Sequence, residues 1–231
     1  MIALLNPKTG SFRKLGGVLL IPIALGLLAP LISAQEESDP EPGKGLTKAS
    51  EPAVGDIGIM LVSKVSSPKV YAPIDGAQQT VMSPAYIDKY SVRLFTKEKW
   101  KEDGLEWDRF YAGAVEKADA LVDELKPTFR RDARGVLDYA EIEHESPWLS
   151  SVLLSRRFFP RFEREFGERL HVVVVGRHRL FVFPADGGRL DSYAPAIADL
   201  YHDESILRHP VSLEIFLVEK GKFRVIGSIE D

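Results

Sequence analysis

Residues 170–188 read LHVVVVGRHRLFVFPADGG, and this stretch decides the fold class that we expect. Two apolar runs are joined by a Gly-Arg-His turn, and the second run ends in Asp-Gly-Gly. Short apolar runs bounded by glycine-containing turns are typical of paired β-strands. A phosphate-binding glycine loop would open into a helix, whereas this turn opens into a strand. We therefore predict a tight hairpin, with Arg177 and His178 at its tip as candidates for contact with a partner.

The segments that follow define the order of elements in the last third of the chain. Residues 190–203 (LDSYAPAIADLYHD) predict a helix, and residues 211–219 and 222–229 predict a second hairpin. The resulting order is β-β-α-β-β. Because hairpins impose antiparallel pairing, we predict an α+β fold, with a mainly antiparallel sheet and helices packed on one face.

Two helices are predicted upstream of this region. In residues 106–127 apolar side chains recur at steps of three and four, and Pro127 ends the pattern. Residues 145–157 (ESPWLSSVLLSRR) predict a second helix, with Ser146 as its N-cap and Pro147 in its first turn. Aromatic residues at helical spacing usually belong to a core, so we assign the apolar side of the long helix to packing.

The composition excludes several classes of function. The chain has 231 residues, of which 45% are hydrophobic and 28% charged, and this balance is typical of a globular protein. The formal net charge of −4 implies no general affinity for nucleic acid. The sequence has no cysteine, which excludes disulfides, thiol catalysis and zinc sites of the cysteine type. We expect neither a cofactor nor a metal site.

The N-terminal region predicts export. In residues 1–34 three basic residues precede an apolar stretch at 15–31, and a small-residue segment ends at Ala34, as in a secretory signal peptide. An uncleaved membrane anchor is the alternative, since about 20 apolar residues span a bilayer, and only this segment would then contact a membrane. Residues 35–55 are acidic and rich in Pro, Gly and Ser, which predicts a flexible linker. Residues 56–231 would then form a single α+β domain, located in the periplasm or outside the cell.

Histidines provide the catalytic candidates. The chain contains no G-x-S-x-G, H-E-x-x-H, Walker or dinucleotide-binding motif. His144 lies among three glutamates at 141–145, a setting that could form an acid–base pair, although a surface strand end has the same pattern. His178 at the predicted hairpin tip is the second candidate. His202 and Asp203 are adjacent on a helix and point in different directions, so they do not form a metal site.

Arginines provide the binding candidates. Arg157, Arg161 and Arg164 share one helical face at steps of four and three, and Arg177 lies at the hairpin tip. Guanidinium groups suit the recognition of carboxylate or phosphate. Glutamates interleaved at 163–168 favour the alternative, in which this is a solvated face with surface ion pairs.

The succession of motifs is distinctive between about residues 90 and 226. It consists of YSVRLFTKEKWKEDGL before the long helix, then ESPWLSSVLLSRRFFP, then ERLHVVVVGRHRLFVFPADGG, a helix, HPVS and GKFRVIG. About three-fifths of the chain thereby resembles the YtpQ-like family of uncharacterised bacterial proteins. The resemblance implies the fold and supplies no reaction, because the family has no established catalytic residues.

These features together predict an exported bacterial protein that acts as a non-catalytic binding or interaction module of the cell envelope. Its partner would be a protein or a small anionic ligand. The alternative is an envelope hydrolase that uses His144 or His178 with a nearby carboxylate. In a third reading, the hairpin at 211–227 offers an edge strand to a partner protein.

Overall fold

The structure, a computed structural model, describes residues 55–230 except 90, 204–206 and 208. The predicted signal peptide or anchor, and the predicted linker up to residue 54, lie outside the described residues. Within the described ranges, no helix combines the length and the apolar character needed to cross a bilayer.

The described chain contains ten strands, four α-helices and two 3-10 helices. In chain order they are β1 (Ile57–Ser63), η1 (Lys64–Ser66), β2 (Ala72–Pro73), β3 (Thr80–Ile87), β4 (Val92–Leu94), α1 (Lys97–Glu102), α2 (Trp107–Glu124), β5 (Thr128–Arg131), β6 (Leu137–Glu143), η2 (Leu149–Leu154), α3 (Phe158–Phe166), β7 (Arg169–Gly176), β8 (Arg179–Pro184), α4 (Leu190–His202), β9 (Glu214–Glu219) and β10 (Lys222–Ser228).

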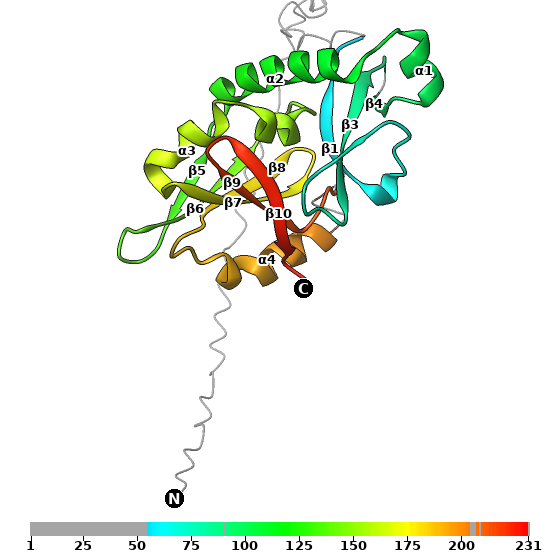
Figure 1. Cartoon of the computed structure of the whole chain (residues 1–231). Coiled ribbons are helices and arrows are strands. Elements are labelled where there is room, and N and C mark those ends of the chain that lie inside the picture. Colours follow the sequence, from blue (N-terminus) through cyan, green and yellow to red (C-terminus); the bar gives the residue numbers. More distant parts are fainter. Residues whose placement is uncertain (1–54, 90, 204–206, 208, 231) are drawn as a thin grey trace, which may run out of the picture. The chain divides into compact units, whose positions relative to one another are not determined.

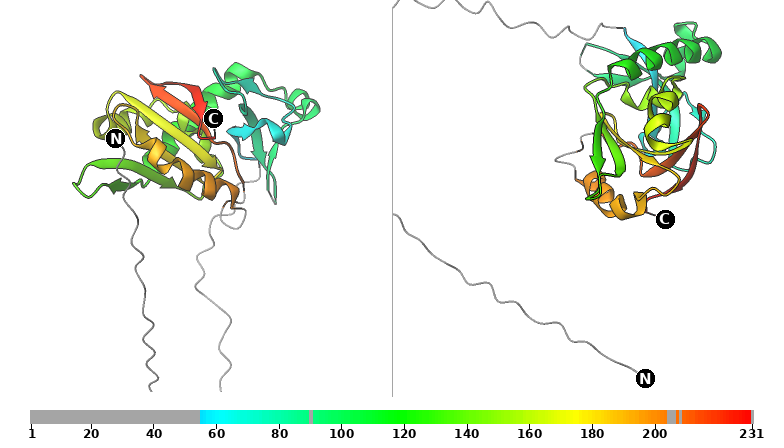
Figure 2. Two further views of the ribbon diagram at one scale, coloured as in Figure 1. Left: turned by 90° about the horizontal axis from the view of Figure 1, so that it is seen from below. Right: turned by 90° about the vertical axis from the view of Figure 1, so that its left-hand side faces the viewer.

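The strands form two antiparallel sheets (Figures 1 and 2). The larger sheet has six strands in the order β10-β9-β7-β8-β6-β5, and the smaller has β1, β3 and β2 with β4 also paired to β3. The predicted hairpin is the β7–β8 pair at the centre of the larger sheet, where Val172 lies opposite Val182. The α+β class and the C-terminal ββαββ order are confirmed.

The central strand β7 is buried on both of its faces. Val172 and Val174 belong to the core cluster that includes Phe158 and Phe162 of α3. Val173 and Val175 belong to a second cluster, which includes Leu190 and Ile197 of α4. Figure 1 shows α2 and α3 on one side of the six-stranded sheet and α4 on the other. The structure therefore differs from the prediction of helices on one face, because an unbroken apolar strand needs cover on both sides.

The 3-10 helix η2 connects the two sheets. Its serine Ser150 is fully buried and accepts a hydrogen bond from the backbone N–H of Leu61 in β1, at 3.0 Å. Ser146 accepts from the N–H of Trp148 at 3.2 Å in the turn before this segment. The prediction of Ser146 as N-cap of an α-helix is wrong, because the segment is a 3-10 helix that begins at Leu149 after Trp148 and has no side-chain cap. The largest core cluster contains residues of both sheets, including Leu61 and Phe216.

A loop of the smaller sheet covers part of the edge strand β10. The N–H of Val225 donates to the carbonyl of Asp75 at 2.8 Å. Gly76 has a φ of +75°, and a Cβ atom at this position would lie 2.2 Å from the carbonyl oxygen of Val225. The close approach is thus possible only for glycine. The middle of β10 is consequently blocked against the addition of a partner strand.

We expect Gly76→Ala to destabilise the protein strongly. Strain at positive φ and overlap with Val225 should together lower the free energy of unfolding by about 2–4 kcal/mol. Gly221→Ala is the matched control, because Gly221 has a φ of +74° and open space around it; it should cost only about 1 kcal/mol. Urea denaturation measures both values, and equal losses would contradict the close approach.

Candidate functional site

The two catalytic candidates, His144 and His178, lie side by side. Strands β6 and β8 are paired, with Glu143 opposite Arg179, so that the ends of these strands bring the two histidines together. The backbone N–H of His144 donates to the carbonyl of His178 at 3.1 Å. The Nδ1 atom of His178 lies 3.0 Å from the carbonyl oxygen of His144. Residues that the sequence presented separately therefore form one site.

A hollow of about 950 Å³ surrounds this pair, and we call it the histidine hollow. Its volume lies near the upper limit for small-molecule sites. The ring of His209 contributes a third imidazole, with its centroid 6.5 Å from that of His178. The charged residues in the lining are Lys126, Glu143, Glu145, Arg177 and Arg179.

Arg177 and Arg179 differ in how their charges are balanced. Arg179 forms ion pairs with Glu143 and, at 3.5 Å, with Glu141. Arg177 is partly buried, and burial lowers the pKa of its guanidinium because the charged form loses hydration. No carboxylate among the described residues forms an ion pair with Arg177, so this partly buried cation is available to a ligand in the hollow.

The hairpin tip holds Arg177 at a fixed position. Its backbone N–H donates to the carbonyl of His209 at 2.9 Å, and Gly176 forms an isolated bridge with Pro210. The side chain of Leu207 packs closely on Gly176. A Cβ atom at position 176 would lie 2.5 Å from the Cδ1 atom of Leu207. Arg177 also lines a smaller hollow of about 210 Å³ beside β1. It therefore stands between two hollows on a supported turn.

Hydrogen bonds fix the tautomers of the two histidines. Nδ1 of His144 accepts from the N–H of Ser146 at 3.0 Å, so the proton of neutral His144 is on Nε2, which lies 4.0 Å from Glu124. Nδ1 of His178 faces a carbonyl, which only accepts, so this nitrogen carries the proton and Nε2 has the lone pair. Of the two, only His178 is therefore free to act as a base.

The described lining of the histidine hollow contains no hydroxyl or thiol group. A hydroxyl or thiol nucleophile is therefore absent from this described lining, which leaves carboxylate and imidazole groups or water for that role. In addition, no cluster of three or more His, Asp or Glu residues suited to a metal ion occurs in the described part of the chain.

The arginine face on α3 contacts the end of α2. Arg157 forms an ion pair with Asp123 of α2. The Nη2 atom of Arg161 donates to the backbone carbonyl of Leu125, the residue that ends α2, at 2.6 Å. Arg164 lies on the same helix with its side chain in solvent. Arg157 and Arg161 therefore connect α3 to the end of α2. Arg177, in contrast, has no ion-pair partner among the described residues.

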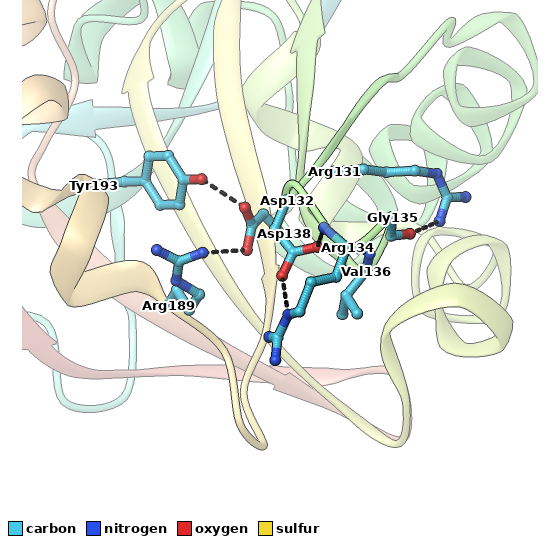
Figure 3. Close-up of polar contacts among 8 residues, drawn as sticks. All are labelled: Arg131, Asp132, Arg134, Gly135, Val136, Asp138, Arg189 and Tyr193. Atoms are coloured by element: carbon cyan, nitrogen blue, oxygen red, sulfur yellow. Dashed lines mark hydrogen bonds and ion pairs between the residues drawn. The ribbon is translucent and has the colours of Figure 1, made fainter.

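A buried aspartate beneath α4 was not singled out in the sequence. The side chain of Asp138 is only 6% exposed and accepts from the hydroxyl of Tyr193 at 2.7 Å and from Nη1 of Arg189 at 3.4 Å (Figure 3). The hydrogen bond to Asp138 raises the pKa of the Tyr193 hydroxyl. The three side chains attach α4 to β6. No local pattern in the sequence predicts this cluster, because Tyr193 is 55 residues away from Asp138. In addition, a β-bulge at this point of β6 interrupts the alternation of side chains between the two faces of the strand.

The neighbouring turn between β5 and β6 is held by its own hydrogen bonds. Asp132 accepts from the N–H groups of Arg134 and Val136, each at 2.8 Å (Figure 3). These bonds lower the pKa of the Asp132 carboxyl, because they favour its charged form. Its carboxylate is thus engaged in the turn.

Comparison of the chain with protein-family models, curated proteins and solved structures finds no match. The similarity to the YtpQ-like family therefore stays a prediction from the sequence motifs.

Loss of the Arg161 contact should reduce stability. Arg161→Ala leaves the carbonyl of Leu125 without this charged donor and should lower the free energy of unfolding by about 1–2 kcal/mol. Arg164→Ala, on the same helix, should stay within about 0.5 kcal/mol of the wild type. Urea denaturation of the two variants measures the difference, and an equal effect would argue against the contact.

Proposed function

We propose that this chain is a non-catalytic binding module of the bacterial cell envelope that binds a small anion in the histidine hollow. The observation that carries the proposal is Arg177, a partly buried guanidinium without an ion-pair partner in the described chain. Carboxylate and phosphate groups match the planar donor fork of arginine. The ligand class is therefore a small carboxylate or phosphate.

The surroundings of Arg177 support this proposal energetically. The guanidinium has already lost part of its hydration on folding, and Coulomb attraction is stronger near protein than in bulk water. An anion therefore gains more at Arg177 than at an exposed arginine. Of the two lining carboxylates, Glu143 is engaged by Arg179, whereas Glu145 lies exposed. Lys126 adds a second positive charge.

A hydrolase is the second candidate function, and the observation that favours it is the lone pair on Nε2 of His178. In this reading His178 removes a proton from a water molecule that attacks the bound substrate. Substitution of His178 by Gln separates the two functions. A binding module keeps its affinity for the anion, whereas a hydrolase loses turnover.

Export is part of the same proposal. It rests on the basic, apolar and small-residue regions that follow one another in residues 1–34. We expect the chain expressed in a bacterium to be recovered from the periplasm or the medium, with Gln35 as its first residue. Cell fractionation followed by N-terminal sequencing makes this measurement. Recovery with the membrane and an intact Met1 would favour the anchor, and a cytoplasmic chain beginning at Met1 would contradict export.

The test of the binding site is a titration with sodium phosphate and sodium acetate at constant ionic strength, followed by thermal unfolding or calorimetry. We expect at least one anion to bind, and Arg177→Met to weaken it at least tenfold, which corresponds to about 1.4 kcal/mol. The control Arg164→Met removes an exposed arginine and should retain wild-type affinity. Sodium chloride at equal strength corrects for screening. Unchanged affinity in Arg177→Met would refute the proposed site.

A further inference from the structure

Glu214, the first residue of β9, is a buried carboxylate with an unsatisfied oxygen. The residue is 2% exposed. Its Oε1 accepts from the backbone N–H groups of Gln78 and Gln79, at 2.6 and 2.8 Å. Its Oε2 is buried without a hydrogen-bond partner among the described residues, and no cation there forms an ion pair with it. A buried carboxylate without a cation costs free energy, so this oxygen suits a donor from a ligand.

Glu214 lines a hollow of about 440 Å³, which we call the glutamate hollow. One wall is the loop at 76–79, and the other is the second half of β10, including Arg224. The side chain of Arg224 has no ion-pair partner in the described chain. The hollow shares no lining residue with the histidine hollow and lies where the two sheets meet. A buried anion and an unpaired cation thus line one small cavity.

We propose that the glutamate hollow is a second binding site, specific for a small zwitterion of the amino-acid type. The ammonium group binds Glu214, and the carboxylate group binds the guanidinium of Arg224. Ammonium donates several hydrogen bonds, which one carboxylate oxygen and neutral oxygen acceptors can accept together. Gln78, Gln79 and Ser228 also line the hollow, and each carries such an acceptor. The planar fork of arginine matches a carboxylate.

Binding at this site is coupled to the contact between the sheets. Oε1 of Glu214 binds the loop at 76–79 by accepting from the N–H groups of Gln78 and Gln79. Because Oε1 and Oε2 belong to the same carboxylate, a ligand that fixes Oε2 also fixes Oε1. A ligand on Oε2 therefore also stabilises the folded arrangement of the loop. Any ligand that binds only the folded state raises the unfolding temperature, by an amount that grows with the ratio of its concentration to its dissociation constant. Thermal unfolding consequently reports on this site directly.

The experiment uses the full chain and three probes at equal ionic strength: glycine, methylammonium chloride and sodium acetate. We expect glycine to give the largest rise in unfolding temperature, since only glycine carries both charges. Glu214→Gln should abolish the response to glycine and to methylammonium. Arg224→Met should weaken the affinity for glycine at least tenfold and leave the response to methylammonium unchanged. The control Lys222→Met, on the same strand and outside the hollow, should behave as the wild type.

The outcomes separate this inference from the anion site. If Glu214→Gln does not fold, the pair Arg224→Met and Lys222→Met decides the matter. The inference is overturned if glycine has no effect on the wild type, or if Arg224→Met binds glycine normally. It also fails if Arg177→Met, rather than Arg224→Met, abolishes the glycine response, because glycine would then bind through its carboxylate in the histidine hollow. Failure of phosphate and acetate to bind at Arg177 leaves the prediction for glycine unaffected.

Discussion

Burial of strand β7 on both faces is the constraint on which the rest of the structure depends. Val172 and Val174 pack toward α3, and Val173 and Val175 pack toward α4, all without exposure to solvent. A strand that is apolar on both sides exposes hydrophobic surface unless two layers cover it. The helices on opposite faces of the six-stranded sheet follow from this requirement. Polar function is consequently confined to the ends and the edge of the sheet.

The two hollows lie at such margins. His144 follows the last residue of β6, and Arg177 and His178 form the turn between β7 and β8. Glu214 begins β9, beside the covered edge strand β10. Strands with a tightly packed interior hold their terminal residues at defined positions, and binding groups are commonly placed on such rigid supports. The packed valines of β7 therefore leave no room for a ligand in the core, and they hold the binding groups at the strand ends in defined positions.

Local patterns in the sequence identify the hairpins and α2, because strand alternation, helical spacing and glycine turns are local properties. The second sheet depends on pairing between β1 and β3, in which Ile57 lies opposite Tyr86, and this pairing is not local. The valine run already contained the signal for helices on both faces. His144 and His178 could be named individually, but their meeting depends on the register of β6 and β8. Asp138 and Glu214 gave no signal, because charged residues in strands usually face water.

The distribution of charge separates structural groups from binding groups. Several exposed charges are paired with neighbours, as in Arg169 with Asp186 and Lys99 with Asp103. Such surface pairs contribute little to stability. Arg177 and Glu214 are more buried, where an unbalanced charge is most costly, yet neither has an ion-pair partner among the described residues. If stability alone decided, the buried charges would be paired and the unpaired charges would be exposed. Groups that reduce stability in this way are typical of sites where a ligand supplies the missing charge.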